Sequence, residues 1–228
     1  MEKLVYVLQT PADHDGAELR AHLVGDVADA IRKCGGGEIS VDVHDEHVTQ
    51  GAERAIRHLD PPVNAAVSFW MQNADDRGAA EEAIMAAAER AHGYLVVESR
   101  PLVHTPPKGE RAPGANLVTC ITRKPGLSDD VFFDLWNNEH RKVACETQST
   151  TAYVRNAIAR PLTPGAPGFD GIVEETFPIG ALTDLKVWYD CDTKEELDAR
   201  LQRMVSSVTA FLDLSVIESV PMSEYYLG

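Results

Sequence analysis

The feature that most constrains the fold is an order of secondary-structure elements that occurs twice. Residues 3–9 form a run rich in β-branched and aromatic side chains, which is typical of a strand. A helix with an apolar residue at every fourth position follows, and Gly35 to Gly37 stop it. We therefore expect strand, helix, strand, strand, helix, strand over residues 3–9, 15–34, 38–43, 63–71, 75–92 and 94–98.

The second half restarts the same order. The pattern predicts strand, helix, strand, strand, helix, strand over residues 117–122, 128–146, 153–159, 185–189, 193–212 and 214–218. Three short matches keep their order between the halves and indicate a duplication. They pair LVYVLQTP with LVTCITRKP at Leu4 and Leu117, SFWMQ with KVWYD at Trp70 and Trp188, and VESRP with IESVP at Glu98 and Glu218.

A βαββαβ unit is the ferredoxin-like arrangement, an antiparallel sheet with both helices on one face. Two such sheets can bury their bare faces against each other. The predicted fold is α+β, with two tandem ferredoxin-like units that form a pseudo-dimeric α+β barrel around a cavity. The alternatives are two sheets packed without a cavity, or copies that each pair with a second subunit. We expect repeats at residues 1–105 and 116–228, with a Pro- and Gly-rich linker at 106–115.

Composition narrows the partners. The chain has 228 residues, with 36 acidic against 21 basic side chains and a net charge of −15. This charge repels phosphate backbones and anionic lipid headgroups, so neither nucleic acid nor a membrane is an expected partner. The apolar run at the N-terminus is too short for a signal peptide. Because the four cysteines form no CxxC pair, a reducing, cytoplasmic setting is expected.

The richest stretch for chemistry is the helix that starts after Ser128, a residue suited to cap it. Phe133, Trp136 and His140 follow at spacings of three and four and share one face of the helix. An imidazole can exchange protons near neutral pH, so His140 is the leading candidate for a general acid or base. The alternative is a purely structural role, in which His140 is buried and hydrogen-bonded to a carbonyl.

The first copy lacks this motif. The match of Leu4 with Leu117 gives an alignment offset of 113 residues between the halves. At this offset, His140 aligns with Val27 and Trp136 aligns with Leu23. Packing alone therefore does not require a tryptophan and a histidine at these positions. If the chain has one site, we expect it in the second half.

The strand after this helix offers two sets of side chains, because alternate residues of a strand face opposite sides. One set holds Tyr153 and Arg155, and the other holds Val154, Asn156 and Ile158. Val154 and Ile158 resemble core beneath a helix. We therefore expect Tyr153 and Arg155 to face the inter-sheet cavity, where a phenol and a guanidinium can stabilise negative charge. In the alternative, Asn156 is the polar group available there.

The segment after this strand carries three prolines and three glycines before Ile172 and is expected to cover the barrel mouth. Asp170, Glu174 and Glu175 are each expected to bond backbone or to be solvated, and Glu174 is the reserve carboxylate partner for His140. Trp70 and Trp188 are expected to hold equivalent core places. No three ligands of the segment HDEH at residues 44–47 are expected to converge, so no metal site is predicted.

Three pieces of the second half resemble a known family. FFDLWNNEH, YVRNAIARPL and FDGIVEETF, within residues 132–177, are similar to segments of EthD-domain proteins of the dimeric α+β barrel superfamily. The resemblance implies a ferredoxin-like unit that forms a barrel and holds hydrophobic or aromatic small molecules, often without a cofactor. Relatives include decarboxylases, cyclases, dehydratases and oxygenases, and fold likeness does not choose among them.

The expected function is that of a cofactor-independent enzyme of lyase type, a decarboxylase, dehydratase or retro-aldol enzyme acting on a hydrophobic or aromatic molecule. The expected catalytic residues are His140, Tyr153 and Arg155, and the expected substrate-binding residues are Phe133, Trp136, Asn156 and Glu174. One alternative is a non-catalytic carrier of a hydrophobic metabolite. Another is an oxygenase, cofactor-free or haem-dependent with His140 as axial ligand. A homodimer is possible, with Tyr225 and Tyr226 reaching a neighbour.

Overall fold

The computed structural model describes all residues from 1 to 228. The strands and helices of the first half are β1 (Glu2–Gln9), α1 (Gly16–His22), α2 (Ala28–Lys33), β2 (Gly37–Val43), β3 (Val63–Met71), α3 (Gly78–Ala86) and β4 (Arg90–Leu102). Those of the second half are β5 (Ala115–Ile121), α4 (Asp129–Asp134), α5 (Arg141–Thr147), β6 (Ala152–Pro161), β7 (Gly171–Phe177), α6 (Leu185–Trp188), α7 (Lys194–Phe211) and β8 (Glu218–Tyr226). One turn of π-helix joins α1 to α2 at Leu23–Val27, and another joins α4 to α5 at Leu135–His140.

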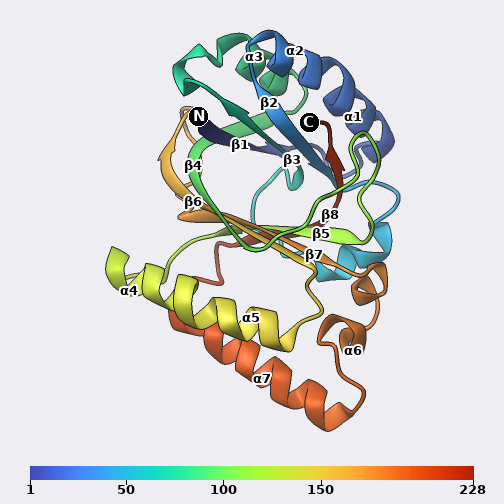
Figure 1. Cartoon of the computed structure of the whole chain (residues 1–228), viewed down its shortest axis with the longest axis vertical. Helices are drawn as coiled ribbons and strands as arrows, with labels where there is room; N and C mark the ends of the chain where they lie inside the picture. Colours follow the sequence, from blue (N-terminus) through green and yellow to red (C-terminus); the bar gives the residue numbers. More distant parts are fainter.

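The eight strands close into one barrel in the order β1-β3-β2-β8-β5-β7-β6-β4. Each half contributes four neighbouring strands in the ferredoxin-like order, and the halves meet where β2 pairs with β8 and β4 pairs with β6. The helices of each half cover the outside of its own strands (Figure 1). The predicted fold is confirmed: a tandem, pseudo-dimeric α+β barrel. The repeat boundary at residues 106–115 stays a prediction.

The alternation of side chains along the strands creates three separate hydrophobic clusters. On β1, Leu4, Tyr6 and Leu8 pack under the first-half helices, while Val5 and Val7 point into the barrel. The second-half helices enclose a cluster of their own on the far side of the barrel. Since opposite faces of one strand serve different clusters, a shift of one residue moves a side chain from one environment to another.

Three strand predictions in the second half are wrong. Residues 185–188 form the short helix α6, because the Asp184 side chain accepts a hydrogen bond from Lys186 N and caps it. The missing strand is β7, which lies in the segment expected to cover the barrel mouth. The last strand runs over Glu218–Tyr226 rather than 214–218. In the first half, the helix expected over 75–92 ends at Ala86, and β4 begins at Arg90.

The structure also overturns two of the three repeat matches. Leu4 pairs with Leu95 and Leu117 pairs with Pro221, so Glu98 corresponds to Glu224 and not to Glu218. Trp70 lies on β3 and Trp188 on a helix, so they do not hold equivalent places. The strand register shows which residues correspond. Leu4 pairs with Phe69, and Leu117 pairs with Glu175, so Phe69 of β3 corresponds to Glu175 of β7. The match between Leu4 and Leu117 does agree with the structure, because each sits at the same place in the central strand of its half.

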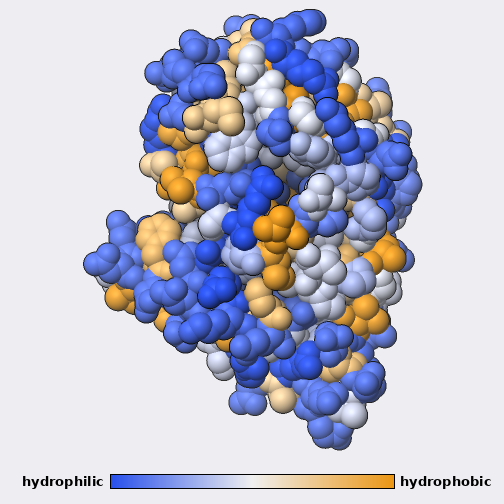
Figure 2. Space-filling model, in the orientation of Figure 1, coloured by the Kyte–Doolittle hydropathy of each residue, from blue (hydrophilic) through white to orange (hydrophobic).

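The face of the molecule seen in Figure 2 is mostly hydrophilic, with hydrophobic side chains in small separate groups. No helix has the length and apolar character needed to cross a bilayer. All four cysteines are free thiols. Tyr225 and Tyr226, expected to reach a neighbouring copy, instead belong to β8, where their hydroxyls donate to Asp45 and Glu38 of the same chain.

Candidate functional site

A cavity of about 350 Å³ lies between the second-half strands and the helices that cover them. Its walls are mostly apolar and come from β5, β6, β7, α6, α7 and the π-helical turn. The polar side chains that reach it include those of His140, Tyr153 and Glu175. It is therefore a hydrophobic chamber with a few groups able to exchange protons or hydrogen bonds, the usual composition of a small-molecule site.

His140 ends the π-helical turn and faces the chamber, as the helical spacing predicted. Ser128 caps the same helix through a bond from Val131 N to its hydroxyl, which confirms the predicted start. The Nδ1 atom of His140 lies 2.9 Å from Ser207 Oγ, and its ring packs on Phe211 with 5.1 Å between centroids. Burial, and next the positive charge of Arg155, lower the pKa of His140 to about 4. The imidazole is therefore neutral at pH 7.

Glu175 is the functional candidate that sequence reasoning missed. It sits on β7 opposite Tyr153 of β6, and its carboxyl group reaches the chamber. The Oε1 atom is buried without a hydrogen-bond partner. Burial raises the pKa of Glu175 to about 7, which makes this acid able to hold or release a proton at neutral pH.

The choice of Glu174 as the reserve partner of His140 is wrong by one residue. Glu174 faces the barrel interior, where its Oε1 accepts a 2.7 Å bond from Asn156 Nδ2. The alternation Val173, Glu175, Phe177 would have identified the helix-facing set, because Val173 and Phe177 belong to the cluster under the helices. This signal was hidden because the strand itself was not recognised.

The predicted orientation of the β6 strand is also wrong. Tyr153 packs in the cluster beneath the helices and is 1% exposed, whereas Ala152 and Val154 line the barrel interior. The larger aromatic ring fills the wider space under the helices. Burial raises the pKa of Tyr153, followed by the effect of the Glu175 charge, so its phenol is neutral. Tyr153 is thus brought together with His140, but on the helix side of the sheet. Asn156, on the other face, is not brought together with them.

Arg155 lies near the chamber without lining it. Its Nη1 donates to Asn137 Oδ1 at 2.6 Å, and its Nε donates to Ser99 Oγ at 3.1 Å. The guanidinium sits 5.9 Å from the ring centroids of both Trp136 and Tyr153. Burial lowers the pKa of Arg155. Arg155 does not reach the chamber, so the structure gives no support to its predicted catalytic role. Its positive charge acts on His140 from a distance.

Trp136 walls a cavity, but this is the chamber beneath the helices and not the expected cavity between the sheets; the residue is 1% exposed. Its indole lies against Gly171, the first residue of β7, where a methyl group in place of hydrogen would approach within 2.5 Å. Phe133 stacks on Trp136 at 6.2 Å between centroids but does not reach the chamber. Of the two aromatic residues predicted to bind substrate, the structure places Trp136 at the cavity and Phe133 behind it.

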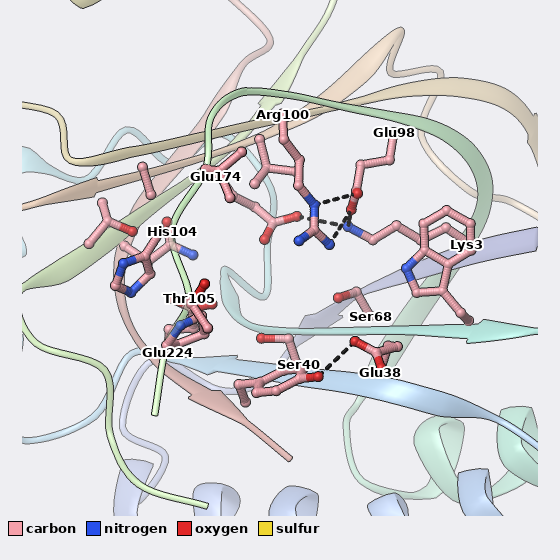
Figure 3. A pocket seen from close by; sticks show the side chains of 18 residues that line it. Lys3, Glu38, Ser40, Ser68, Glu98, Arg100, His104, Thr105, Glu174 and Glu224 are labelled. Carbon is pink, nitrogen blue, oxygen red and sulfur yellow. Dashed lines mark hydrogen bonds and ion pairs between the residues drawn. The ribbon is translucent and has the colours of Figure 1, made fainter. Parts of the chain in front are cut away.

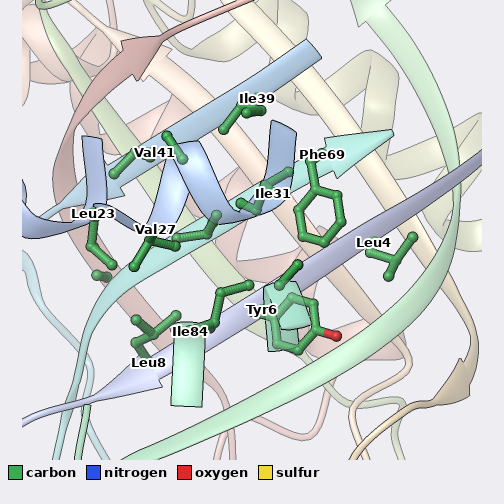
Figure 4. Close-up of a cluster of buried hydrophobic side chains, with 14 of the residues drawn as sticks. Leu4, Tyr6, Leu8, Leu23, Val27, Ile31, Ile39, Val41, Phe69 and Ile84 are labelled. Atoms are coloured by element: carbon green, nitrogen blue, oxygen red, sulfur yellow. The ribbon is translucent and has the colours of Figure 1, made fainter. Parts of the chain in front are cut away.

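The first half shows what the same architecture does without a chamber. Its π-helical turn carries Leu23 and Val27 where the second half has Trp136 and His140. Phe69 holds the place of Glu175, and Ile39, next to Phe69, holds that of Tyr153. All four are 0% exposed within one packed cluster (Figure 4). The duplicated fold therefore does not need the polar set of the second half.

One further group was expected not to converge and does. Ligand atoms of Asp45, Glu46 and His47 lie within 4.8 Å of one another. Arg20 Nη1 is 2.8 Å from both Asp45 Oδ2 and Glu46 Oε1, and the Tyr225 hydroxyl also donates to Asp45. A guanidinium therefore already compensates these carboxylates.

Comparison with known proteins agrees with this architecture. A sequence model of the EthD domain family matches residues 124–203, the part that contains His140, Tyr153 and Glu175. The resemblance inferred from the sequence is thus confirmed for this segment. No curated protein matches the sequence significantly.

Two solved structures illustrate the likeness in fold, and a third is less similar. An anthrone oxidase-like protein is 12% identical with a TM-score of 0.60, covering 100% of this chain and 94% of that chain. A dye-decolorizing peroxidase from Bacteroides thetaiotaomicron VPI-5482 is 8% identical with a TM-score of 0.50, covering 99% and 93%. A chlorite dismutase from Candidatus Nitrospira defluvii is 10% identical with a TM-score of 0.47, covering 98% and 90%. At these identities the first two matches establish a shared fold and no shared activity. The fold is that of an α+β barrel, and residues 124–203 in its second half match the EthD domain family.

Proposed function

We propose that this protein is an enzyme that acts on a hydrophobic, aromatic small molecule in the second-half chamber by proton transfer. The observation that carries the proposal is the contrast between the halves. Val27, Ile39 and Phe69 fill the first-half core. His140, Tyr153 and Glu175 occupy the corresponding places around a cavity of about 350 Å³. Buried polar groups cost stability, so their presence here favours a functional role.

Each polar residue has a role that fits its protonation state. Glu175, with a pKa of about 7, can remove a proton from an acidic carbon or hydroxyl and return it later. Neutral His140 can accept a hydrogen bond through Nε2 when Nδ1 donates to Ser207. The neutral Tyr153 phenol can donate to an oxygen that becomes negative as the proton leaves. The acid–base role assigned to His140 from sequence is therefore shared with Glu175.

The reaction that we favour is of lyase type, such as decarboxylation, dehydration or retro-aldol cleavage, because these steps need only proton transfer and stabilisation of an enolate. A second candidate is an oxidase or cofactor-free oxygenase, in which the same deprotonated substrate reacts with dioxygen. The fold likeness to an anthrone oxidase-like protein favours this candidate. Dehydration and the reaction with dioxygen begin with removal of a proton from carbon. Retro-aldol cleavage instead begins with loss of a hydroxyl proton, and decarboxylation begins with loss of CO₂. All of these reactions pass through an enolate, at whose carbon a proton is removed or added.

Hydrogen–deuterium exchange tests the proton transfer at the enolate carbon, which these reactions have in common, without knowledge of the natural substrate. We expect the protein to accelerate exchange of the α-protons of 2-tetralone in D₂O, followed by proton NMR. Glu175→Gln and His140→Ala should each reduce the enzymatic exchange rate by roughly 10²-fold or more. The matched control is Glu139→Gln, whose side chain is 64% exposed and lies next to His140 in sequence. Folded variants that exchange as fast as the parent protein would refute the proposal.

Two further measurements distinguish the carrier and the haem-dependent oxygenase from the proposed enzyme. A carrier would bind the ketone, detected by tryptophan fluorescence, without accelerating exchange. A haem-dependent oxygenase needs an axial ligand, and His140 is the only imidazole that lines the chamber. The residues of the chamber could therefore supply one axial nitrogen ligand to a haem iron, and they include no second histidine for the other side. Added haem should then give a Soret band that His140→Ala shifts or abolishes, and the absence of any band would eliminate this alternative.

A further inference from the structure

A second cavity lies inside the barrel, on the opposite face of the sheet from the His140 chamber. It measures about 230 Å³, and most of the residues that line it are polar. In Figure 3, the linked side chains of Lys3, Glu98 and Arg100 occupy one side, and Glu224 and Ser40 lie across from them. The seam where β2 of the first half pairs with β8 of the second borders this cavity.

The two sides of the cavity differ in charge compensation. Lys3 Nζ is 2.6 Å from Glu98 and 3.6 Å from Glu174, and Arg100 also pairs with Glu98. At the seam, Asp42 stands directly opposite Glu224, and neither carboxylate has a basic partner within 4.0 Å. Like charges in directly opposed strand positions repel. The seam therefore carries two carboxyl groups that have no direct ion pair.

Asn116 on β5 supplies an independent sign that a ligand belongs there. Its Nδ2 donates to Asp42 Oδ1 at 2.8 Å, which leaves its Oδ1 as an acceptor. This oxygen is buried without a hydrogen-bond partner, the residue is 3% exposed, and it lines the cavity. Buried acceptors of this kind are normally satisfied, so a donor is missing at this point.

We propose that the barrel-interior cavity binds a small organic cation, namely a short-chain aliphatic primary ammonium. An ammonium group offers three donors and a positive charge, which match the Asn116 acceptor and the Glu224 carboxylate, with Asp42 behind them. The alkyl chain has Ala152 and Val154 on the wall to pack against. The proposal does not depend on the chemistry assigned to the His140 chamber.

The titration behaviour of the cavity agrees with this assignment. The titratable side chains that face or border it are Lys3, Arg100 and His104, the phenol of Tyr226, and the carboxyl groups of Glu38, Asp42, Glu98, Glu174 and Glu224. Burial, and next the charge of Glu174, raise the pKa of Glu224 to about 7 and raise the pKa of Asp42. A bound cation would favour the ionised carboxylates and displace their protons.

Calorimetric titration with n-butylammonium chloride at pH 7 tests the proposal. We expect saturable one-to-one binding with release of a fraction of a proton, seen as a difference in heat between phosphate and Tris buffers. Glu224→Gln and Asn116→Leu should each weaken binding roughly tenfold or more, because each removes an acceptor. Glu82→Gln, on the exposed face of α3, is the matched control and should bind as the parent protein does.

Two controls separate the sources of an apparent signal. Neutral n-butanol should not bind, and KCl at the same concentration should neither bind nor compete. Because Glu224→Gln removes a repulsion, this variant should fold, and circular dichroism melting checks it. The proposal is overturned if butylammonium does not bind, if potassium binds equally well, or if folded Glu224→Gln and Glu82→Gln bind with the same affinity.

Discussion

At the scale of single residues, the chemistry of the second-half chamber depends on which face of a strand a carboxylate occupies. Glu174 and Glu175 are neighbours in sequence, but Glu174 faces the barrel interior and Glu175 faces the chamber that His140 also lines. Because alternate side chains of a strand point to opposite faces, their environments have nothing in common. Glu175 is buried without a partner for Oε1, whereas Glu174 is bonded to Asn156.

The raised pKa of Glu175 predicts how its replacement affects stability. The pKa of Glu175 is about 7 in the folded protein, whereas the ordinary value for the unfolded chain is 4.5. When an acid has a higher pKa in the folded state, the folded protein loses stability as the pH rises from the lower value to the higher one. Glu175→Gln should therefore gain stability relative to the parent protein over this interval, by roughly 2 kcal/mol once cavity solvent is allowed for. Urea unfolding at pH 5 and pH 8 measures it.

Both the parent protein and the Glu175→Gln variant carry His140. The lowered pKa of His140 makes stability rise with pH, but equally in both proteins, so this effect cancels when they are compared. A stability difference between variant and parent that stays constant from pH 5 to pH 8 would contradict the assignment of Glu175 as the protonated acid of the chamber.

At the scale of elements, the π-helical turns are the feature that the two halves share and use differently. Both turns interrupt the first long helix of their half, at Leu23–Val27 and at Leu135–His140. Such turns occur often at functional sites. Here the turn itself belongs to the fold, since the first half keeps it with apolar residues. Only the side chains that it presents distinguish a packed core from a chamber.

The contact between this turn and the sheet predicts a specific defect. In Gly171→Ala, the added methyl group would meet Trp136 Cη2 at 2.5 Å and Cζ3 at 3.0 Å, so the indole must move. We expect a loss of roughly 1 to 3 kcal/mol in the free energy of unfolding, together with a change in tryptophan fluorescence. Gly168→Ala is the control, because a methyl group there meets nothing within 4 Å. Equal effects of the two substitutions would show that the contact is unimportant.

At the scale of the whole molecule, the barrel exists because the halves complete each other. The β2–β8 and β4–β6 pairings close the sheet, and without a partner each half would expose two strand edges and the residues of the barrel interior. We therefore propose that the repeats, divided within residues 106–115, behave as two subunits joined by a linker.

Two co-expressed chains, residues 1–107 and 108–228, should then associate one-to-one into the closed barrel. Lys108 and Arg111 stay with the second chain, where they lie beside Tyr226 and Tyr225 of β8. Size-exclusion chromatography with light scattering should report the mass of the intact chain, 24.9 kDa. A half that folds cooperatively as a monomer when expressed alone would count against this division.

The sequence by itself determined the tandem α+β barrel, because the periodic spacing of apolar residues follows directly from helix and strand geometry. It also located the His140 helix, since capping by Ser128 and the positions of Trp136 and His140 are local features. The strand at Gly171–Phe177 escaped detection, because Pro and Gly before it favoured a loop and KVW imitated a strand.

Only the tertiary structure decided where the chemistry lies. Strand alternation defines two faces but does not say which one the helices cover, so Tyr153 and Arg155 were assigned to the wrong side. The pairing of β6 with β7 brings Glu175 opposite Tyr153, and burial then raises the pKa of Glu175. Such long-range register and desolvation arise from contacts between distant segments, which no local pattern encodes.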